Sequence, residues 1–279
     1  MAQPTMLRHM PSRVGRPSRA TAPGVDPSDT PRDERWEAAL AVTPRDPSGP
    51  LHEWLLDQLG TAVTDGTMAP DQILRIEELE EQYGVSRTVV REAVKVLESM
   101  SMVASRRRIG IRVLPVESWN VYDPRLIRWR LDGPGRMDQL TSISQLRRGI
   151  EPLAARLAAQ QADVDHAQAL TAAATGMAVA ARIPDLIDYL GHDIAFHTTL
   201  LRASGNEMIA ALAPVVREVL VGRTHHHLMP SVPEPQAVRW HGQVAAAIAG
   251  GRVDEAENTM RAIVDESQTA MAAIATADH

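Results

Sequence analysis

The feature that most constrains this sequence is its second half, where strand patterns are absent and helical periodicity continues almost to the end. After Asp123 the apolar residues are mostly alanine and leucine, and they recur three and four positions apart, as on one face of an α-helix. The predicted helices occupy residues 138–161, 163–181, 184–203, 206–228, 235–250 and 252–275. Because short connections make neighbouring helices antiparallel, we expect residues 137–279 to form an all-helical antiparallel bundle.

Shorter elements precede this bundle. Leucines at helical spacing after Leu51 predict a first helix, and a second short helix ends at Gly84. Ser86 suits the N-cap of a third helix, after which the alternation of residues 111–113 predicts two strands around a turn. Three short helices followed by a hairpin form a winged helix-turn-helix, which we assign to residues 49–116. The fold class is therefore mainly α, with an N-terminal winged helix-turn-helix and a C-terminal helical bundle.

The remaining segments have simpler expectations. Residues 1–48 are rich in proline, serine and arginine with little apolar periodicity, so we expect a disordered tail. Residues 117–136 are expected to be a linker with a short helix. The chain has no cysteine, which excludes disulfides and thiolate metal sites, and it shows no signal peptide and no apolar run of membrane-spanning length. A cytoplasmic protein without a membrane partner is the expectation that follows.

Charge is segregated within the winged segment. The net charge of −6 excludes a protein that coats nucleic acid nonspecifically, but it does not exclude a small DNA-reading element. Arg87 and Arg91 lie in the first turns of the third helix, where the helix dipole disfavours cations. Phosphates or base edges would relieve that conflict, and Ser86 and Thr88 add hydroxyl groups at the same end. The pattern favours a recognition helix in the major groove of double-stranded DNA; the alternative is a surface helix with solvated arginines.

The third helix also carries a family resemblance. The run from Gly84 to Ala93, with Leu97 and the arginine-rich hairpin, resembles the GntR family of winged-helix regulators. The resemblance implies DNA contacts by Ser86, Arg87, Thr88, Arg91, Arg107 and Arg108, the last two through the minor groove.

Two residues depart from the family pattern. Glu77 stands where members often carry a DNA-contacting arginine, and Arg108 replaces the first glycine of the usual wing turn.

A candidate metal site lies in the bundle. Asp193 and His197 are four positions apart, on one face of a helix, where a carboxylate and an imidazole can share a divalent cation. His241, on a later helix, offers a third ligand if the bundle brings it inward. The alternative is a hydrogen-bonded polar pair and a surface histidine.

Residues 123–275 resemble the all-helical ligand-binding domain, often called FCD, of the FadR subgroup of GntR regulators. The likeness rests on Leu146–Pro152, on the Asp193–His197 run and on His241. It implies that the aspartate and two histidines bind a divalent metal, zinc or similar, which helps to hold a carboxylate effector. The family's fourth ligand, a histidine, falls here on Ile263. The connector from Trp119 to Trp129 is similar to that of sugar-acid-responsive members, which implies a sugar acid as effector.

Arg147 is the expected partner of the effector's carboxylate, because a guanidinium can donate two parallel hydrogen bonds to it. Glu151, four positions later, offers a competing intrahelical ion pair. Arg148 takes the role if the helix is rotated. Consecutive residues point in different directions on a helix, so we interpret His225–His227 mainly as a solvated helix end, with His226 or His227 as a minor candidate for the pocket.

Two function classes follow from these motifs. The first is a non-enzymatic, homodimeric repressor that binds a palindromic operator and is released by a small carboxylate effector. The second is a metal-dependent phosphohydrolase of the HD type, suggested by the adjacent His192-Asp193 pair. Such an enzyme needs further ligands, and the nearby candidates Asp163, Asp165 and His166 fit poorly. A helical scaffold without a small ligand is a third alternative.

Overall fold

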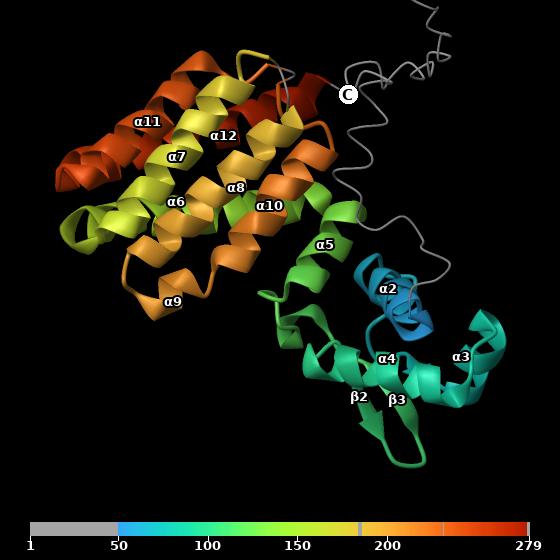
Figure 1. Ribbon diagram of the computed structural model, residues 1–279. Helices are drawn as coiled ribbons and strands as arrows, with labels where there is room; N and C mark the ends of the chain where they lie inside the picture. Colours follow the sequence, from blue (N-terminus) through green and yellow to red (C-terminus); the bar gives the residue numbers. More distant parts are fainter. Residues whose placement is uncertain (1–49, 184–185, 231, 278–279) are drawn as a thin grey trace, which may run out of the picture. The chain divides into compact units, whose positions relative to one another are not determined.

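The computed structural model describes residues 50–183, 186–230 and 232–277 (Figure 1). The tail expected at residues 1–48 lies outside them. The described part is mainly α-helical, as the sequence predicted, and contains three short strands. Within these ranges, no helix has the length and apolar character needed to cross a membrane.

The N-terminal described segment forms a winged helix-turn-helix. Its helices are α2 (Leu51–Thr64), α3 (Ile76–Tyr83) and α4 (Arg87–Ser99), and its hairpin strands are β2 (Val103–Arg106) and β3 (Gly110–Val113). The sequence predicted only this pair of strands, but a third, β1 (Ile73–Leu74), pairs antiparallel with β3 and gives the sheet order β1-β3-β2. Two residues are too short for a recognisable alternation, so only the pairing with β3 defines β1 as a strand.

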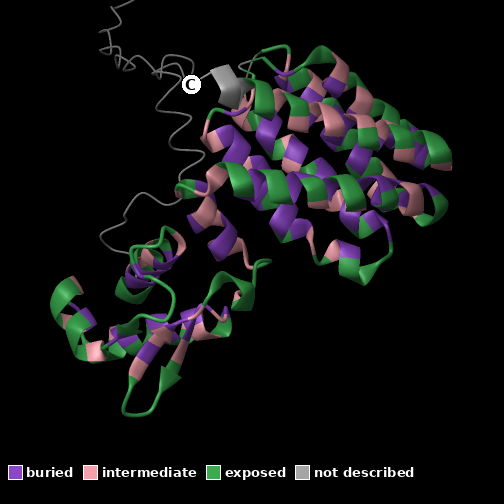
Figure 2. Cartoon of the chain, turned by 180° about the vertical axis from the view of Figure 1, so that it is seen from behind, coloured by how far each residue is buried: buried purple, intermediate pink, exposed green. Residues whose placement is uncertain are grey.

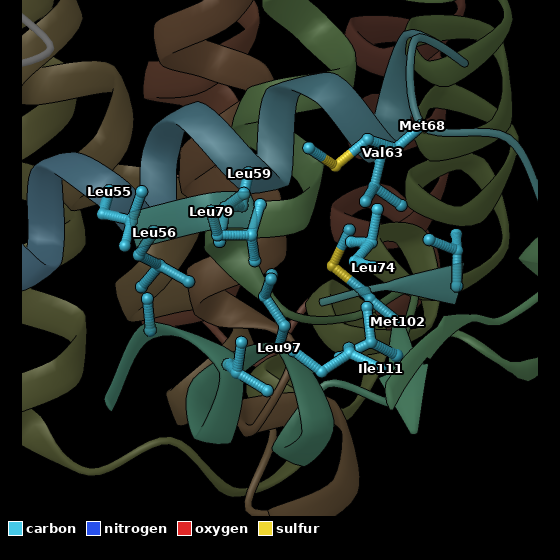
Figure 3. Packing of buried hydrophobic residues seen from close by; sticks show 14 of the residues in the cluster. Leu55, Leu56, Leu59, Val63, Met68, Leu74, Leu79, Leu97, Met102 and Ile111 are labelled. Carbon is cyan, nitrogen blue, oxygen red and sulfur yellow. The ribbon is translucent and has the colours of Figure 1, made fainter. Parts of the chain in front are cut away.

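Apolar side chains from each helix fill the core of this segment (Figure 3). Leu55 and Leu59 on α2 face Leu97 on α4, while Met102 and Ile111 cover the core from the hairpin. All five are almost completely buried. This packing stabilises the scaffold that carries α4, and each buried leucine contributes about 1.5–3 kcal/mol by leaving water.

Glycines permit two sharp changes of direction around α4. Gly84, with φ of 64°, ends α3 in the left-handed region and turns the chain toward Ser86, which occupies the N-cap of α4. At Gly110, φ is 127° and a Cβ would lie 2.7 Å from the carbonyl oxygen of Leu74, so a side chain there would separate β3 from β1. The helix-turn-helix and the sheet therefore both depend on these positions.

A connector leads from the hairpin to the bundle. It contains a 3-10 turn, η2 (Val116–Ser118), and a helix, α5 (Pro124–Asp132). Asp123 caps α5 by accepting a hydrogen bond from the backbone N–H of Arg125, and Pro124 suits the first helical turn because its missing N–H would have no partner there. Ile127 and Leu131 of α5 join the apolar core of the bundle.

The bundle contains the long helices predicted from periodicity. They are α6 (Arg136–Gln161), α7 (Val164–Ala180), α8 (Leu186–Ala203), α10 (Ala213–His225), α11 (Pro235–Ala249) and α12 (Val253–Ala277), with a short α9 (Glu207–Ala210). The single helix predicted over 206–228 is divided into α9 and α10. Pro214 explains the division, because proline is accommodated in the first turn of α10 and not within a continuous helix.

Helix α8 lies at the centre of the bundle, packed against α6, α7 and α10. Its neighbour α6 packs on α12, and α11 packs on both α7 and α12. Figure 2 shows the result, with buried residues along the inner stripe of each helix and exposed residues along the outer one. A polar side chain on the inner face of α8 is consequently far from bulk water.

Candidate functional site

A buried polar centre forms where α8 meets α11. The structure brings together the three residues expected as metal ligands, Asp193 and His197 of α8 and His241 of α11, each at most 3% exposed. One ligand atom from each residue lies within 4.8 Å of the others. The Nε2 atoms of His197 and His241 lie 3.3 and 3.5 Å from Oδ1 of Asp193.

The donor atoms of this trio suit a divalent cation. Oδ1 of Asp193 and Nε2 of His241 are buried and have no hydrogen-bond partner, although they lie close together. Nδ1 of His241 lies 2.7 Å from the backbone carbonyl oxygen of Ala237. If Nδ1 donates a hydrogen bond to that oxygen, Nε2 of the neutral ring is unprotonated and its lone pair is available to a metal. Burial lowers the pKa of His241 to about 4, which keeps its ring neutral at pH 7. Two imidazoles and a carboxylate are typical ligands of zinc and similar transition metals.

A second carboxylate and an arginine extend the centre. Glu151 of α6 accepts hydrogen bonds from Nε and Nη2 of Arg147 at 2.8 and 3.3 Å, and its Oε2 lies 3.0 Å from Nδ1 of His197. Burial alone would raise the pKa of Glu151, but Arg147 and His197 lower it to about 2. Burial lowers the pKa of His197, but Glu151 and Asp193 more than offset that effect, so the pKa of His197 lies above its ordinary value.

Arg223 of α10 completes the charge balance. Its Nη2 donates to Oδ2 of Asp193 at 2.6 Å, and its Nη1 donates to the hydroxyl of Ser267 on α12. Burial would raise the pKa of Asp193, but the Arg223 guanidinium holds it well below its ordinary value. Two buried guanidiniums, of Arg147 and Arg223, thus face the two buried carboxylates, of Glu151 and Asp193.

A small cavity adjoins this centre. Its volume is about 40 Å³, room for a few water molecules and too little for a six-carbon acid. Charged and aromatic groups line one part of it, and residues 228–230 with Pro233, Glu234 and Met271 line another. Ile263, where the family places a fourth ligand, presents an apolar side chain to the same cavity.

The two expected effector arginines lie in different places. Arg147 is buried and lines the cavity, paired with Glu151 as the competing interpretation anticipated. Arg148 is more than half exposed, and its Nε lies 2.7 Å from Oδ1 of Asp265 on α12. It does not line the cavity, because the next position on α6 points outward.

The residues required by the phosphohydrolase alternative do not converge. His192 points away from the buried centre, its Nε2 lying 3.6 Å from Oδ1 of Asp188 on the same helix and its side chain 37% exposed. Asp163 is the N-cap of α7, where it accepts a hydrogen bond from the backbone N–H of His166. These residues serve local helix structure, and the adjacent His192-Asp193 pair does not form a joint ligand set.

A separate site lies at the start of α4. Ser86 is the N-cap residue by its backbone, but its side chain makes no capping hydrogen bond, contrary to the expectation for a good N-cap. Thr88 and Arg91 are exposed on the first turns. Arg87 is exposed as well, but its Nη1 donates to Oε1 of Glu77 on α3 at 2.8 Å. The departure from the family pattern at Glu77 therefore has a structural consequence, an ion pair that must open if Arg87 is to bind a phosphate.

The hairpin presents its arginines at its tip. Arg107 and Arg108 are exposed in the turn, which is closed by a hydrogen bond from Ile109 N–H to the carbonyl of Arg106 at 3.1 Å. Arg108 has φ of 66°, a left-handed conformation that explains why glycine is usual in this turn. Glu98 of α4 accepts a hydrogen bond from Ser105 N–H at 2.7 Å and links the hairpin to α4.

Sequence reasoning missed Arg223 as a member of the buried centre. The pattern that would have indicated it is an arginine within an apolar helical stripe, seven positions after Val216 and four after Val219. Glu151 was considered only as an ion-pair partner of Arg147, and its contact with His197 joins residues 46 positions apart, which local spacing cannot reveal.

Comparison with known proteins connects both sites to characterised domains. The profile described as bacterial regulatory proteins of the gntR family matches residues 52–113, and the FCD domain matches residues 142–266. The chain is 29% identical to the uncharacterized HTH-type transcriptional regulator YieP of Escherichia coli K12 over 213 residues, which cover 75% of this chain and 90% of the relative. It is 27% identical to the galactonate operon transcriptional repressor of Escherichia coli K12 over 156 residues, which cover 56% of this chain and 67% of the repressor.

A solved structure supports the same fold. The structure of Lar, which controls expression of the Listeria monocytogenes agr system, superposes with a TM-score of 0.52 at 18% identity, over 80% of this chain and 96% of that one. At this identity the likeness concerns the fold alone. The matched domains and the named relatives are those of transcription regulators and not of enzymes.

Proposed function

The chain belongs to the GntR family of bacterial regulators, with an FCD domain, and from this premise we propose that it is a dimeric repressor released from a palindromic operator by a small carboxylate effector. DNA-binding regulation follows from the family and its domains. The buried centre carries the rest of the proposal: it combines balanced charges with unpartnered donor atoms that suit a divalent cation.

The DNA-contacting residues are Ser86, Thr88 and Arg91 on α4, with Arg107 and Arg108 on the hairpin. Their support is exposure and position, because helix N-termini and arginine side chains both favour phosphate oxygens and base edges. Arg87 contacts DNA as well when its guanidinium leaves the ion pair with Glu77 and binds a phosphate instead. In a homodimer, two such helices would lie one DNA turn apart on a palindromic operator.

Asp193, His197 and His241 would hold the divalent metal, zinc or similar. When bound, the ion would supply a Lewis-acidic position for a carboxylate oxygen. The hydrogen bond from His241 to Ala237 orients the imidazole, and Arg223 orients the carboxylate of Asp193 through the oxygen that a metal does not need.

Charge balance favours an anionic effector. Arg147 and Arg223 are already paired with Glu151 and Asp193, so a divalent cation adds positive charge to this buried centre. A buried excess charge is costly, and an incoming carboxylate lowers that cost. Arg147 lies on the cavity wall and is the group positioned to donate to this carboxylate.

The effector class is a sugar acid. Around the cavity, Tyr189, Ser267 and Glu266 offer hydroxyl and carboxyl groups that can hydrogen-bond the hydroxyls of a polyol chain. A relative is named as the galactonate operon repressor, which agrees with this chemistry. The cavity is too small for such an acid as it stands, so binding requires the lining residues to move.

Movement at the cavity can reach α5 through α10. Arg223 of α10 holds Asp193, and Glu218, five positions earlier on α10, accepts hydrogen bonds from Nε and Nη2 of Arg128 on α5 at 3.2 and 3.1 Å. Helix α5 follows the winged segment in the chain. An effector that favours one placement of α10 therefore shifts the population of domain arrangements and weakens operator binding.

The test combines binding and release. Aldonic, uronic and simple hydroxy acids are screened by thermal shift, with and without zinc, and each acid that raises the melting temperature is added to a gel shift on DNA upstream of the protein's own gene. We expect metal-dependent stabilisation by a sugar acid and release of the DNA. Arg147→Gln should lose the response, and Arg148→Gln, which alters the exposed neighbour, should keep it. Binding of DNA that no acid alters would contradict the proposed effector control.

A further inference from the structure

A second cluster of metal-ligating side chains lies outside the buried centre, where α5 and α10 both end. Asp132 is the last residue of α5, His225 the last residue of α10, and His226 its C-cap. One ligand atom from each lies within 4.8 Å of the other two. Nε2 of His226 is 3.2 Å from Oδ1 of Asp132, and the two histidine rings meet edge to face with centroids 4.9 Å apart.

We propose that Asp132, His225 and His226 form a second binding site for a transition-metal ion such as zinc. The sequence suggested a solvated helix end for these histidines, or a pocket role for His226 or His227. The structure instead directs His226 toward Asp132, and none of the three histidines lines the cavity beside Asp193.

A simple ion pair does not account for the cluster. It would explain the approach of His226 to Asp132, but it leaves Nδ1 of His225 buried and without a hydrogen-bond partner. Buried ring nitrogens normally have partners, so an unpartnered one on a residue that lies within ligand distance of two other donor groups is a candidate metal ligand. The side chain of Asp132 is 38% exposed, so water can complete the coordination shell.

The backbone around the cluster also favours a cation. Helices α5 and α10 both end here, and the unpaired carbonyl groups of a helix C-terminus carry partial negative charge. The guanidinium of Arg136 donates through its Nε to the carbonyl oxygen of Leu131 at 2.6 Å. The ion-pair contact of Asp132 is with His226.

The ligand chemistry selects the ion. Two imidazole nitrogens and one carboxylate oxygen suit zinc, cobalt or nickel, whereas magnesium and calcium require sites made mostly of oxygen ligands. The site differs from the buried centre in its exposure, since the side chain of Asp132 is 38% exposed and that of Asp193 only 1%. Ions can therefore enter it without rearrangement of the bundle.

A metal in this site would join α10, which reaches the buried centre, to α5, which follows the winged segment in the chain. Helix α10 carries Arg223 into the buried centre two positions before His225, and α5 begins the bundle after the winged segment. A metal that bridges the ends of α5 and α10 would fix the distance between these two helices. Metal binding at the surface site could then influence the same helices as the effector.

The experiment measures zinc binding to the full chain, purified without a histidine tag and stripped with a chelator, by isothermal titration. The surface variant is D132N/H226Q, and the buried-centre variant is D193N/H197Q. We expect the wild type to bind two equivalents, the surface variant to lose one, and the buried-centre variant to retain the surface one. H227Q, which alters the neighbouring histidine, should keep both.

The outcomes separate this site from the proposed function. If the buried centre fails to bind metal, the wild type binds one equivalent, and the surface variant binds none. Cobalt absorption in the visible region provides a second readout. D132N/H226Q should lose the part of the absorption that D193N/H197Q retains, while its circular dichroism is unchanged. A surface variant that takes up as much zinc as the wild type, with the same affinity and the same cobalt bands, overturns the proposal.

Discussion

The winged segment and the bundle differ in how they organise charge. In the winged segment the ion pair of Arg87 and Glu77 lies on the surface, and opening it costs little because both side chains are more than half exposed. In the bundle, Arg147 and Glu151 are excluded from water, so each depends on the other. An exposed charged side chain can bind another molecule, whereas a buried charged side chain mainly affects the stability of the fold.

Glu151→Ala should produce the largest effect. It leaves the buried guanidinium of Arg147 without its carboxylate, and loss of one partner of a buried ion pair typically costs about 3–5 kcal/mol. The measurement is the free energy of unfolding from urea denaturation in the presence of a chelator. The matched control is Asp265→Ala, which removes the exposed partner of Arg148 and should cost about 0–1 kcal/mol. Equal losses in both variants would remove the contrast between the two environments.

Zinc should have the next largest effect, again on stability. With the surface cluster removed by D132N/H226Q, zinc at about 100 times its dissociation constant should stabilise the fold by about 2.7 kcal/mol, because it binds the folded buried centre. Adding His241→Ala to that background removes one ligand and should abolish the gain. A gain that persists without His241 would show that zinc acts elsewhere.

Arg91→Ala should weaken operator binding with no change in stability. Loss of a base or phosphate contact by an exposed arginine costs about 1–3 kcal/mol of binding free energy, or roughly 5- to 150-fold in affinity. Gel shifts at fixed ionic strength measure it, and a thermal melt should match that of the wild type. Arg202→Ala, an exposed arginine at the end of α8, is the control and should bind DNA normally. Unaltered affinity in Arg91→Ala would exclude α4 as the recognition helix.

Glu77→Gln should have the smallest effect, in the opposite direction. It releases Arg87 from its ion pair and removes a negative charge near the expected phosphates, so DNA affinity should rise by about two- to fivefold. The steepness of the salt dependence should increase with it, since one more cation displaces counterions. Glu53→Gln in the first turn of α2 provides a charge-matched control. A decrease in affinity would indicate that Glu77 positions Arg87 on DNA.

The two regions also differ in how far sequence reasoning reached. In the winged segment, three helices, the hairpin and six candidate DNA-contacting residues came from one contiguous stretch, and the structure places those residues on the surface of α4 and the hairpin. Strand β1 was missed, because two residues have no periodicity of their own. In the bundle, the same reasoning identified the helices and the trio around Asp193, but it left Arg147 with two alternatives and missed Arg223.

The sequence by itself determined the fold class, the order of the elements and the family, since periodicity, turn residues and a ten-residue run are local properties of the chain. Only the tertiary structure decided which charged groups are buried and with whom they pair. Arg147 and Arg148 are adjacent in the sequence, yet packing against α8 buries one beside His197, while the other extends toward solvent. Burial depends on contacts between helices far apart in the chain. Because the dielectric constant of the core is low, burial also sets the strength of the electrostatic interactions between the charged groups of the site.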